Sequence, residues 1–271
     1  MAIATLDGAL AGMQAARRFG KAITPTMVAG RPQSLWGLGG APGAGSFDTT
    51  LAGVALSSSG GLVNGQLPHF DPAGGLSAYL GRLTGVASQP GSLLLCDRLW
   101  HNGGITITST SAQTINSVVF PARDNAGTTN GDGVLLGVEV SSVTGSGTPV
   151  ITAGYTNQAN VSGKSATNSV ATVASSAAGA FYPIGQQSGD TGVRSVQSLT
   201  LSATWTSGTI NLVAYRVLAE LPLTQANVAN ELDALTGGRP QLFNGAVPFL
   251  IFVPSTTTAA NVSGVYTETQ G

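Results

Sequence analysis

Charge is scarce in this sequence. Asp, Glu, Lys and Arg make up 8% of the 271 residues, against about 25% in an average soluble domain. Lysine occurs twice, as Lys21 and Lys164, and the formal net charge is −1. A nucleic-acid surface needs clustered Lys and Arg, so we expect no nucleic-acid partner. A free monomer with so few charges has little protection against association. We therefore expect much of the surface to be covered by other protein chains.

Cysteine, histidine and long apolar runs are scarce as well. The single cysteine, Cys96, excludes an intrachain disulfide, so we expect a fold that forms without oxidation. The two histidines, His69 and His101, form no pair with each other or with Cys96 at metal-ligand spacing. No apolar run is long enough to predict a membrane span. We therefore expect no metal, no other cofactor and no membrane partner.

The stretch LLLCDRLWHNGG, residues 93–104, is the strongest candidate for catalysis. A cysteine nucleophile needs a histidine base within hydrogen-bond reach, and here Cys96 precedes His101 by five residues. The alternative is a buried strand, because Cys96 follows three leucines and buried cysteine behaves as a small apolar residue. We favour the buried strand and expect the protein not to be an enzyme, since sites are argued from geometry and not from residue types.

The loop DNAGTTNGDG, residues 124–133, offers carboxylate and amide oxygens that calcium binds. Its order lacks the D-x-D-x-D-G spacing and the distal bidentate glutamate of a calcium loop. Asn-Gly and Asp-Gly pairs are strong turn formers. We interpret the loop as a turn between strands.

Short β-rich runs separated by glycine-rich turns occupy residues 92–220. Apolar residues alternate clearly with polar ones in ITITST, residues 105–110, and in SVQSLTLSA, residues 195–203. Runs at this spacing predict an antiparallel sandwich or jelly roll. We expect a mainly β protein, with a β-sandwich or jelly-roll-like domain over residues 92–271.

Residues 1–91 are predicted to form an extended N-terminal arm with short helices. Apolar residues at helical spacing over residues 3–13, followed by Arg17 and Arg18, predict a first helix. A second helix is predicted over residues 71–83, beginning at Asp71-Pro72. Residues 25–65 show no periodicity, and a structureless segment of this length argues against a compact unit.

Three apolar residues of this arm are predicted to contact another chain. Leu35, Trp36 and Leu38 lie within GRPQSLWGLGGAPGAG, a stretch otherwise rich in glycine and proline. Tryptophan is enriched in protein interfaces, so we predict that Trp36 docks on a partner. Arg17 and Arg18 are predicted to belong to the same partner interface.

Residues 221–271 are predicted to complete the domain. Val228, Leu232 and Leu235 fall at helical spacing and predict a C-terminal helix over residues 225–236. AVPFLIFV is nearly continuous in apolar residues and predicts a strand that is buried on both faces. The polar tail that follows is either a last strand or a second arm.

The three tryptophans allow two interpretations. Trp36, Trp100 and Trp205 form a sugar-stacking platform in one, and pack in cores or interfaces in the other. We favour the second, with Trp100 packed at the entrance of a sheet and Trp205 at a hairpin tip.

Several segments resemble a known family when taken as a set. LLLCDRLWHNGGITITSTSAQTINS, FPARDNAGTTNGDGVLLGVEVSS and SGDTGVRSVQSLTLSA resemble virion structural proteins of tailed bacteriophages, and the likeness spans residues 90–253, including AVPFLIFVPS. The resemblance implies a particle component and no catalytic residue. Within that class we expect a decoration or cement protein on the capsid surface. Its expected partners are the major capsid protein and neighbouring copies of itself, with a homotrimer as the predicted assembly.

An arm that orders on contact ties neighbouring subunits together, and many copies multiply a modest interface. Two alternatives stay open. One is a tail, neck or baseplate component, and the other is a host-carbohydrate-binding module on the virion.

Overall fold

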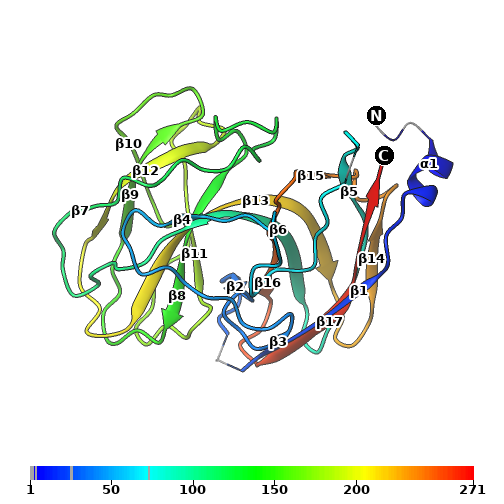
Figure 1. The fold of residues 1–271 in the computed structure, drawn as a ribbon. Helices are drawn as coiled ribbons and strands as arrows, with labels where there is room; N and C mark the ends of the chain where they lie inside the picture. Colours follow the sequence, from blue (N-terminus) through cyan, green and yellow to red (C-terminus); the bar gives the residue numbers. More distant parts are fainter. Residues whose placement is uncertain (1–2, 4, 25–26, 73) are drawn as a thin grey trace.

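The computed structural model describes residues 3, 5–24, 27–72 and 74–271, and it shows a mainly β protein with three antiparallel sheets (Figure 1). This confirms the predicted fold class. Among the described residues the one helix is α1, Leu6–Ala11. Thr5 caps it by accepting a hydrogen bond from the Gly8 amide at 3.1 Å. We name the sheets terminal, central and outer.

The terminal sheet brings together strands from both ends of the chain. Its order is β14-β5-β17-β1-β3, and β15 also pairs with β5. The strands are β1 (Arg17–Ile23), β3 (Gly40–Ala41), β5 (Ala78–Ala87), β14 (Asn230–Asp233), β15 (Gln241–Leu242) and β17 (Ala260–Gln270). Because β17 lies between β1 and β5, the polar tail of the sequence is an interior strand of this sheet.

The central sheet has the order β11-β8-β13-β6-β16-β2, with β4 also pairing with β6. The strands are β2 (Gln33–Ser34), β4 (Val54–Ala55), β6 (Gly91–His101), β8 (Leu135–Ser142), β11 (Phe181–Ile184), β13 (Thr209–Leu223) and β16 (Pro248–Pro254). The Ser34 amide donates to the Gly179 carbonyl at 2.7 Å, and the Phe181 amide donates to the Pro32 carbonyl at 2.9 Å. These bonds join the two ends of the sheet, which therefore curls around its own interior.

The outer sheet has the order β10-β9-β12-β7. Its strands are β7 (Gln113–Thr114), β9 (Ile151–Asn157), β10 (Lys164–Thr167) and β12 (Val193–Leu201). The predicted strand in SVQSLTLSA is confirmed as part of β12. The predicted strand in ITITST is wrong, because residues 105–110 form an irregular segment whose isoleucines, Ile105 and Ile107, are nevertheless buried.

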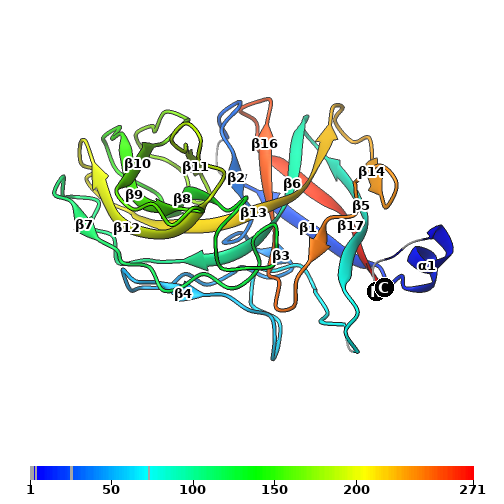
Figure 2. The same cartoon turned by 90° about the horizontal axis from the view of Figure 1, so that it is seen from above.

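Three apolar cores share the central sheet. The first lies against the outer sheet and contains Trp205, the second lies against the terminal sheet and contains Tyr266, and the third fills the curl and contains Trp36. Strand β13 supplies residues to all three. Its register shifts near Tyr215 and Val217 mark bulges, which bend a strand. β13 therefore runs from one lobe of the molecule to the other (Figure 2).

The helix predicted over residues 71–83 is wrong, because β5 begins at Ala78. Leu80 and Leu83 have the spacing of a helix face, and both are buried in the second core. In the pairing of β5 with β17, Arg82 faces Thr267 and Leu80 faces Glu268, so Gly81 between them has no partner residue. An extra residue of this kind moves the following side chains to the other face of a strand. The bulge therefore produces helical spacing within a strand.

The helix predicted over residues 225–236 is also wrong. Residues 230–233 form β14, which pairs with β5, and Asn227 has a φ of 61° that an α-helix does not contain. Val228 and Leu235 are exposed. Their spacing therefore does not mark the buried face of a helix.

The expectation of an extended arm is corrected for the part of residues 1–91 that the structure describes. Helix α1 ends at Ala11, and Arg17–Ile23 pair with β17 instead of continuing the helix. Strands β2, β4 and β5 likewise pair with β16, β6 and β17. Strand edges leave N–H and C=O groups that must be satisfied, and these pairings satisfy them within the chain.

Candidate functional site

Two of the predicted interface residues lie inside the protein. Leu35 and Trp36 are 1% and 0% exposed. The Trp36 indole Nε1 donates to the Ser46 carbonyl at 2.8 Å, and its ring meets Phe249 edge-on at 6.1 Å. Trp36 is thus an anchor, as its surroundings in the sequence indicated, but it docks on the central sheet of its own chain. The prediction that it contacts a partner is corrected.

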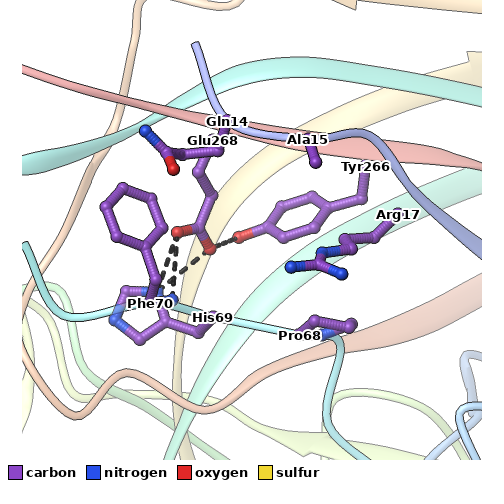
Figure 3. Close-up of a pocket in the computed structure, with 8 residues that line it drawn as sticks. All are labelled: Gln14, Ala15, Arg17, Pro68, His69, Phe70, Tyr266 and Glu268. Carbon is purple, nitrogen blue, oxygen red and sulfur yellow. Dashed lines mark hydrogen bonds and ion pairs between the residues drawn. The ribbon is translucent and has the colours of Figure 1, made fainter. Parts of the chain in front are cut away.

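The other three predicted interface residues reach the surface. Leu38 is half-buried beside the second core, and Arg17 and Arg18 are exposed on β1. Their contact with a partner stays a prediction. Arg17 also lines a small cavity between β1, β17 and the segment over residues 68–70 (Figure 3).

This cavity holds a cluster of titratable side chains. The Nδ1 of His69 lies 3.0 Å from each carboxylate oxygen of Glu268, and its Nε2 lies 3.1 Å from Oδ1 of Asp71. The Tyr266 hydroxyl donates to the same Glu268 carboxylate (Figure 3). Burial disfavours the charged form of His69, but the hydrogen bond and charge of Glu268 and the charge of Asp71 outweigh it and raise the pKa of His69.

The geometry of the cluster is suited to holding segments of the chain together, and we call His69, Asp71 and Glu268 the clamp. The cavity has a volume of about 60 Å³, far below the several hundred Å³ of a typical ligand pocket. Asp71 also accepts hydrogen bonds from the Gly245 amide and the Ser59 hydroxyl, both at 2.7 Å. His69 and its partners therefore tie residues 59–71 to the turn at Gly245 and to β17.

We expect the clamp to make stability depend on pH. A histidine whose pKa is raised by folding stabilises fully below its unfolded value of about 6.5, and the contribution is lost as pH rises through the folded pKa. His69→Gln should lower the free energy of unfolding by roughly 1.5–3 kcal/mol at pH 6, the range for hydrogen bonds to charged groups. Urea unfolding at pH 6 and pH 9 measures this, and an equal loss at both values would contradict the assignment.

Cys96 and His101 do not form a nucleophile and base. Cys96 is 0% exposed, and burial, helped by the charge of Asp97, raises the pKa of its thiol. Burial and the neighbouring charge of Arg98 lower the pKa of His101 to about 3. Its Nδ1 accepts a hydrogen bond from Arg98 Nε at 3.1 Å. The buried-strand interpretation of this stretch is confirmed, because residues 91–101 form β6.

The same stretch contributes to two buried ion pairs that sequence reasoning missed. Arg98 Nη1 lies 2.7 Å from Glu139 Oε2, and both side chains are 0% exposed. Arg123 binds both carboxylate oxygens of Asp97, at 3.0 and 3.2 Å. The Arg98 guanidinium also lies 4.5 Å above the Trp36 ring. The sequence signal for these ion pairs was an Asp-Arg dipeptide within an apolar strand, because charged side chains in a buried strand need partners of opposite charge.

The tryptophan platform for carbohydrate is wrong. Trp36, Trp100 and Trp205 are each 0% exposed, and a stacking platform needs an accessible ring face. The interpretation of Trp100 as a packed residue is confirmed, since it belongs to the first core. The prediction that Trp205 lies at a hairpin tip is wrong, because β12 and β13 on either side of it belong to different sheets and its ring is buried in the first core.

The loop over residues 124–133 is held by its own backbone. The Asp124 carboxylate accepts hydrogen bonds from the amides of Ala126, Thr128 and Gly131 at 2.7–3.0 Å. Within the described residues, no group of three or more His, Cys, Asp or Glu side chains is placed to hold a metal. The described part of the chain also contains no helix that is long and apolar enough to cross a membrane.

A cluster of exposed leucines stands out on the surface. Leu6 and Leu10 on α1 are 53% and 59% exposed, and Leu235 after β14 is 74% exposed. Leu6 and Leu235 line a common depression of about 280 Å³, and Leu10 follows Leu6 by one helical turn. We call Leu6, Leu10 and Leu235 the leucine patch. Large exposed apolar groups that gather in one place are typical of interaction sites.

The chain is weakly similar to solved virus-particle structures. A structure of infectious bursal disease virus, Gx strain, is 10% identical, with a TM-score of 0.19 over 95% of this chain and 61% of that one. The VP2 subviral particle of infectious bursal disease virus is 9% identical, with a TM-score of 0.19 over 95% of this chain and 80% of that one. The chain thus spans less than two thirds of the first of these. Similarity at this level carries no argument about function.

No protein-family model matches the chain. No curated protein matches it either.

Proposed function

We propose that this chain is a non-enzymatic virion structural protein that binds and stabilises a phage capsid shell as a decoration or cement protein. The leucine patch is the observation that carries the proposal. It presents three large apolar side chains on a body that is otherwise poor in charge. Burying such a patch against a shell is favourable, at roughly 25 cal/mol per Å² of apolar area.

The architecture changes the mechanism that the sequence suggested. In the described residues the N-terminal segment is already paired within the sheets, so docking does not require it to order. A surface that is formed before binding loses less conformational entropy on association than an arm that orders on contact. The resemblance of residues 90–253 to virion structural proteins of tailed phages supports the same proposal.

We propose a homotrimer on the capsid surface, with the major capsid protein and neighbouring copies as partners. Arg17 and Arg18 are exposed on β1 and are available to such contacts. Closed symmetry around a threefold axis suits a protein that covers a junction between subunits. Sedimentation equilibrium should give three times the chain mass of 27.0 kDa, and a monomer at all concentrations would contradict the trimer.

The leucine patch should be needed for shell binding and not for folding. Leu10→Ser and Leu235→Ser each remove an exposed side chain, so stability should change by about 0.5 kcal/mol or less. Together they should weaken binding to purified capsid shells that lack this chain by tenfold or more, about 1.4 kcal/mol. Co-sedimentation with the shells measures the affinity.

Val119→Ser is the matched control, because Val119 is 73% exposed and Leu235 is 74% exposed. This control should bind normally. Equal binding by the double leucine variant and the wild type would contradict the proposal. The number of copies per particle separates a shell protein, with hundreds of copies, from a tail, neck or baseplate component with a dozen or fewer.

A further inference from the structure

An open groove lies at the β3 side of the terminal sheet. It has a volume of about 640 Å³ and is lined by residues 20–22, Thr24, the segment over residues 37–40 and residues 261–263. Strand β3 ends the sheet on this side and pairs with β1. Both residues of β3, Gly40 and Ala41, are exposed. The groove therefore crosses β17, β1 and β3 and reaches, at β3, a sheet edge that no other strand covers among the described residues.

Lys21 lies at the base of this groove. It is 4% exposed, and its ammonium donates to the carbonyls of Leu38 at 2.7 Å and Gly43 at 3.3 Å. A lysine ammonium has three donors, so one remains beyond these two bonds. Burial lowers the pKa of Lys21 to about 8, which leaves the side chain mostly charged at neutral pH.

The charge of Lys21 lacks a counter-ion in the described part of the chain. Lys21 is the one charged residue among those that line the groove. No ion pair among the described residues includes it, whereas the other lysine, Lys164, lies 3.5 Å from Asp190. Buried lysines are almost always paired with an opposite charge. A carboxylate that enters the groove would supply that charge and accept the third hydrogen bond.

The walls of the groove leave space for an extended backbone. The open space lies at Gly39, where an added side chain would meet no atom within 4 Å, whereas one at Gly37 would meet Phe47 and one at Gly40 would meet the Gly20 carbonyl. The half-buried Leu38 adds apolar surface between them. Extended peptides commonly add to an exposed sheet edge through main-chain hydrogen bonds, while side-chain contacts provide specificity.

We propose that this groove binds an extended segment of another protein chain and that an aspartate or glutamate of that segment pairs with the ammonium of Lys21. Charge complementarity selects this occupant, since the groove offers one cation and otherwise neutral walls. The inference does not depend on a role in a capsid. It applies to any partner that presents an acidic residue in an extended strand.

The test uses two blocked peptides, acetyl-Gly-Ser-Glu-Ser-Gly-amide and its glutamine counterpart, titrated to about 20 mM into the isotope-labelled full chain. The glutamate peptide should shift the amide resonances of residues 37–40 and 261–263 saturably and should raise the pKa of Lys21. It should bind at least tenfold more tightly than the glutamine peptide, the factor that 1.4 kcal/mol provides. No saturable shift, or equal binding of the two peptides, would overturn the proposal.

Two variants locate the site. Lys21→Met should remove the preference for glutamate, while Gly39→Leu should block both peptides because it fills the groove without touching the bonds of Lys21. Circular dichroism confirms that each variant is folded. The glutamine peptide keeps the proposal testable on the wild type even if Lys21→Met loosens the segment over residues 38–43. Undiminished binding to a folded Gly39→Leu chain would place the peptide elsewhere and refute the assignment.

Discussion

Arg98→Met is expected to lower the free energy of unfolding by about 3–5 kcal/mol, the usual result of removing one partner of a buried ion pair. The substitution leaves the Glu139 carboxylate without its 2.7 Å partner at a position that is 0% exposed. It also removes the donor to His101 and the cation above Trp36. Urea unfolding followed by tryptophan fluorescence measures the loss as a lower midpoint.

The double variant Arg98→Met/Glu139→Gln separates the charge effect from packing. Because it removes the isolated carboxylate, it should recover more than half of the lost stability. The pair also leaves Arg98 Nη2 and Glu139 Oε1 without hydrogen-bond partners, so neutral replacements lose little. If the double variant is as unstable as Arg98→Met, the cost lies in packing and the electrostatic explanation is wrong.

Arg82→Met provides the exposed control for the same kind of change. Arg82 lies 2.8 Å from Glu231, and the two side chains are 51% and 43% exposed. An exposed pair contributes about 0–1 kcal/mol because water screens it. Two pairs with nearly equal distances should therefore differ several-fold in their effect on stability.

Acidification from pH 6.5 to pH 5 is expected to lower the free energy of unfolding by about 1.5–2 kcal/mol through His101 alone. Burial and the charge of Arg98 lower its pKa from 6.5 to about 3, so the unfolded chain takes up the proton first. The stabilisation is complete above pH 6.5 and is lost as pH falls, at about 1.4 kcal/mol per pH unit. Urea unfolding at half-unit steps of pH measures the slope.

His101→Gln should flatten this slope between pH 6.5 and pH 5, a window that lies above the ordinary titration of carboxylates. His69 does not interfere, because the stabilisation from its raised pKa is constant below 6.5 and changes only above it. The two histidines together predict a stability maximum near pH 6.5. An unchanged acidic slope in His101→Gln would show that other groups cause it.

Strand prediction succeeded where the apolar pattern matched a single sheet environment. AVPFLIFV is almost continuously apolar, and it forms β16 between β6 and β2, with residues 248–252 all buried. The pattern failed at Leu80 and Leu83, because a bulge at Gly81 reproduces helical spacing in a strand. A bulge depends on the partner strand, β17, which lies about 180 residues away in the sequence.

The candidate sites depend even more on distant partners. His69 meets Glu268 across 199 positions, and Arg98 meets Glu139 across 41. Sequence reasoning singled out both histidines as unusual residues, but it had no means of identifying their partners. It also placed Trp36 on the surface, because a tryptophan among glycines and prolines looks the same whether its partner is another chain or its own sheet.

The sequence by itself determined the mainly β class, the buried strand around Cys96 and a surface poor in charge. These properties follow from local features of the sequence, namely the alternation of apolar and polar residues, the strand-forming residue types and the composition. The tertiary structure decided which apolar residues are covered, since burial depends on what each strand pairs with. It placed Leu35 and Trp36 inside the curl of the central sheet and left Leu6, Leu10 and Leu235 in water. It also placed Lys21 on β1, one strand in from the edge of the terminal sheet, where its ammonium donates to two carbonyl oxygens and pairs with no carboxylate of the described chain.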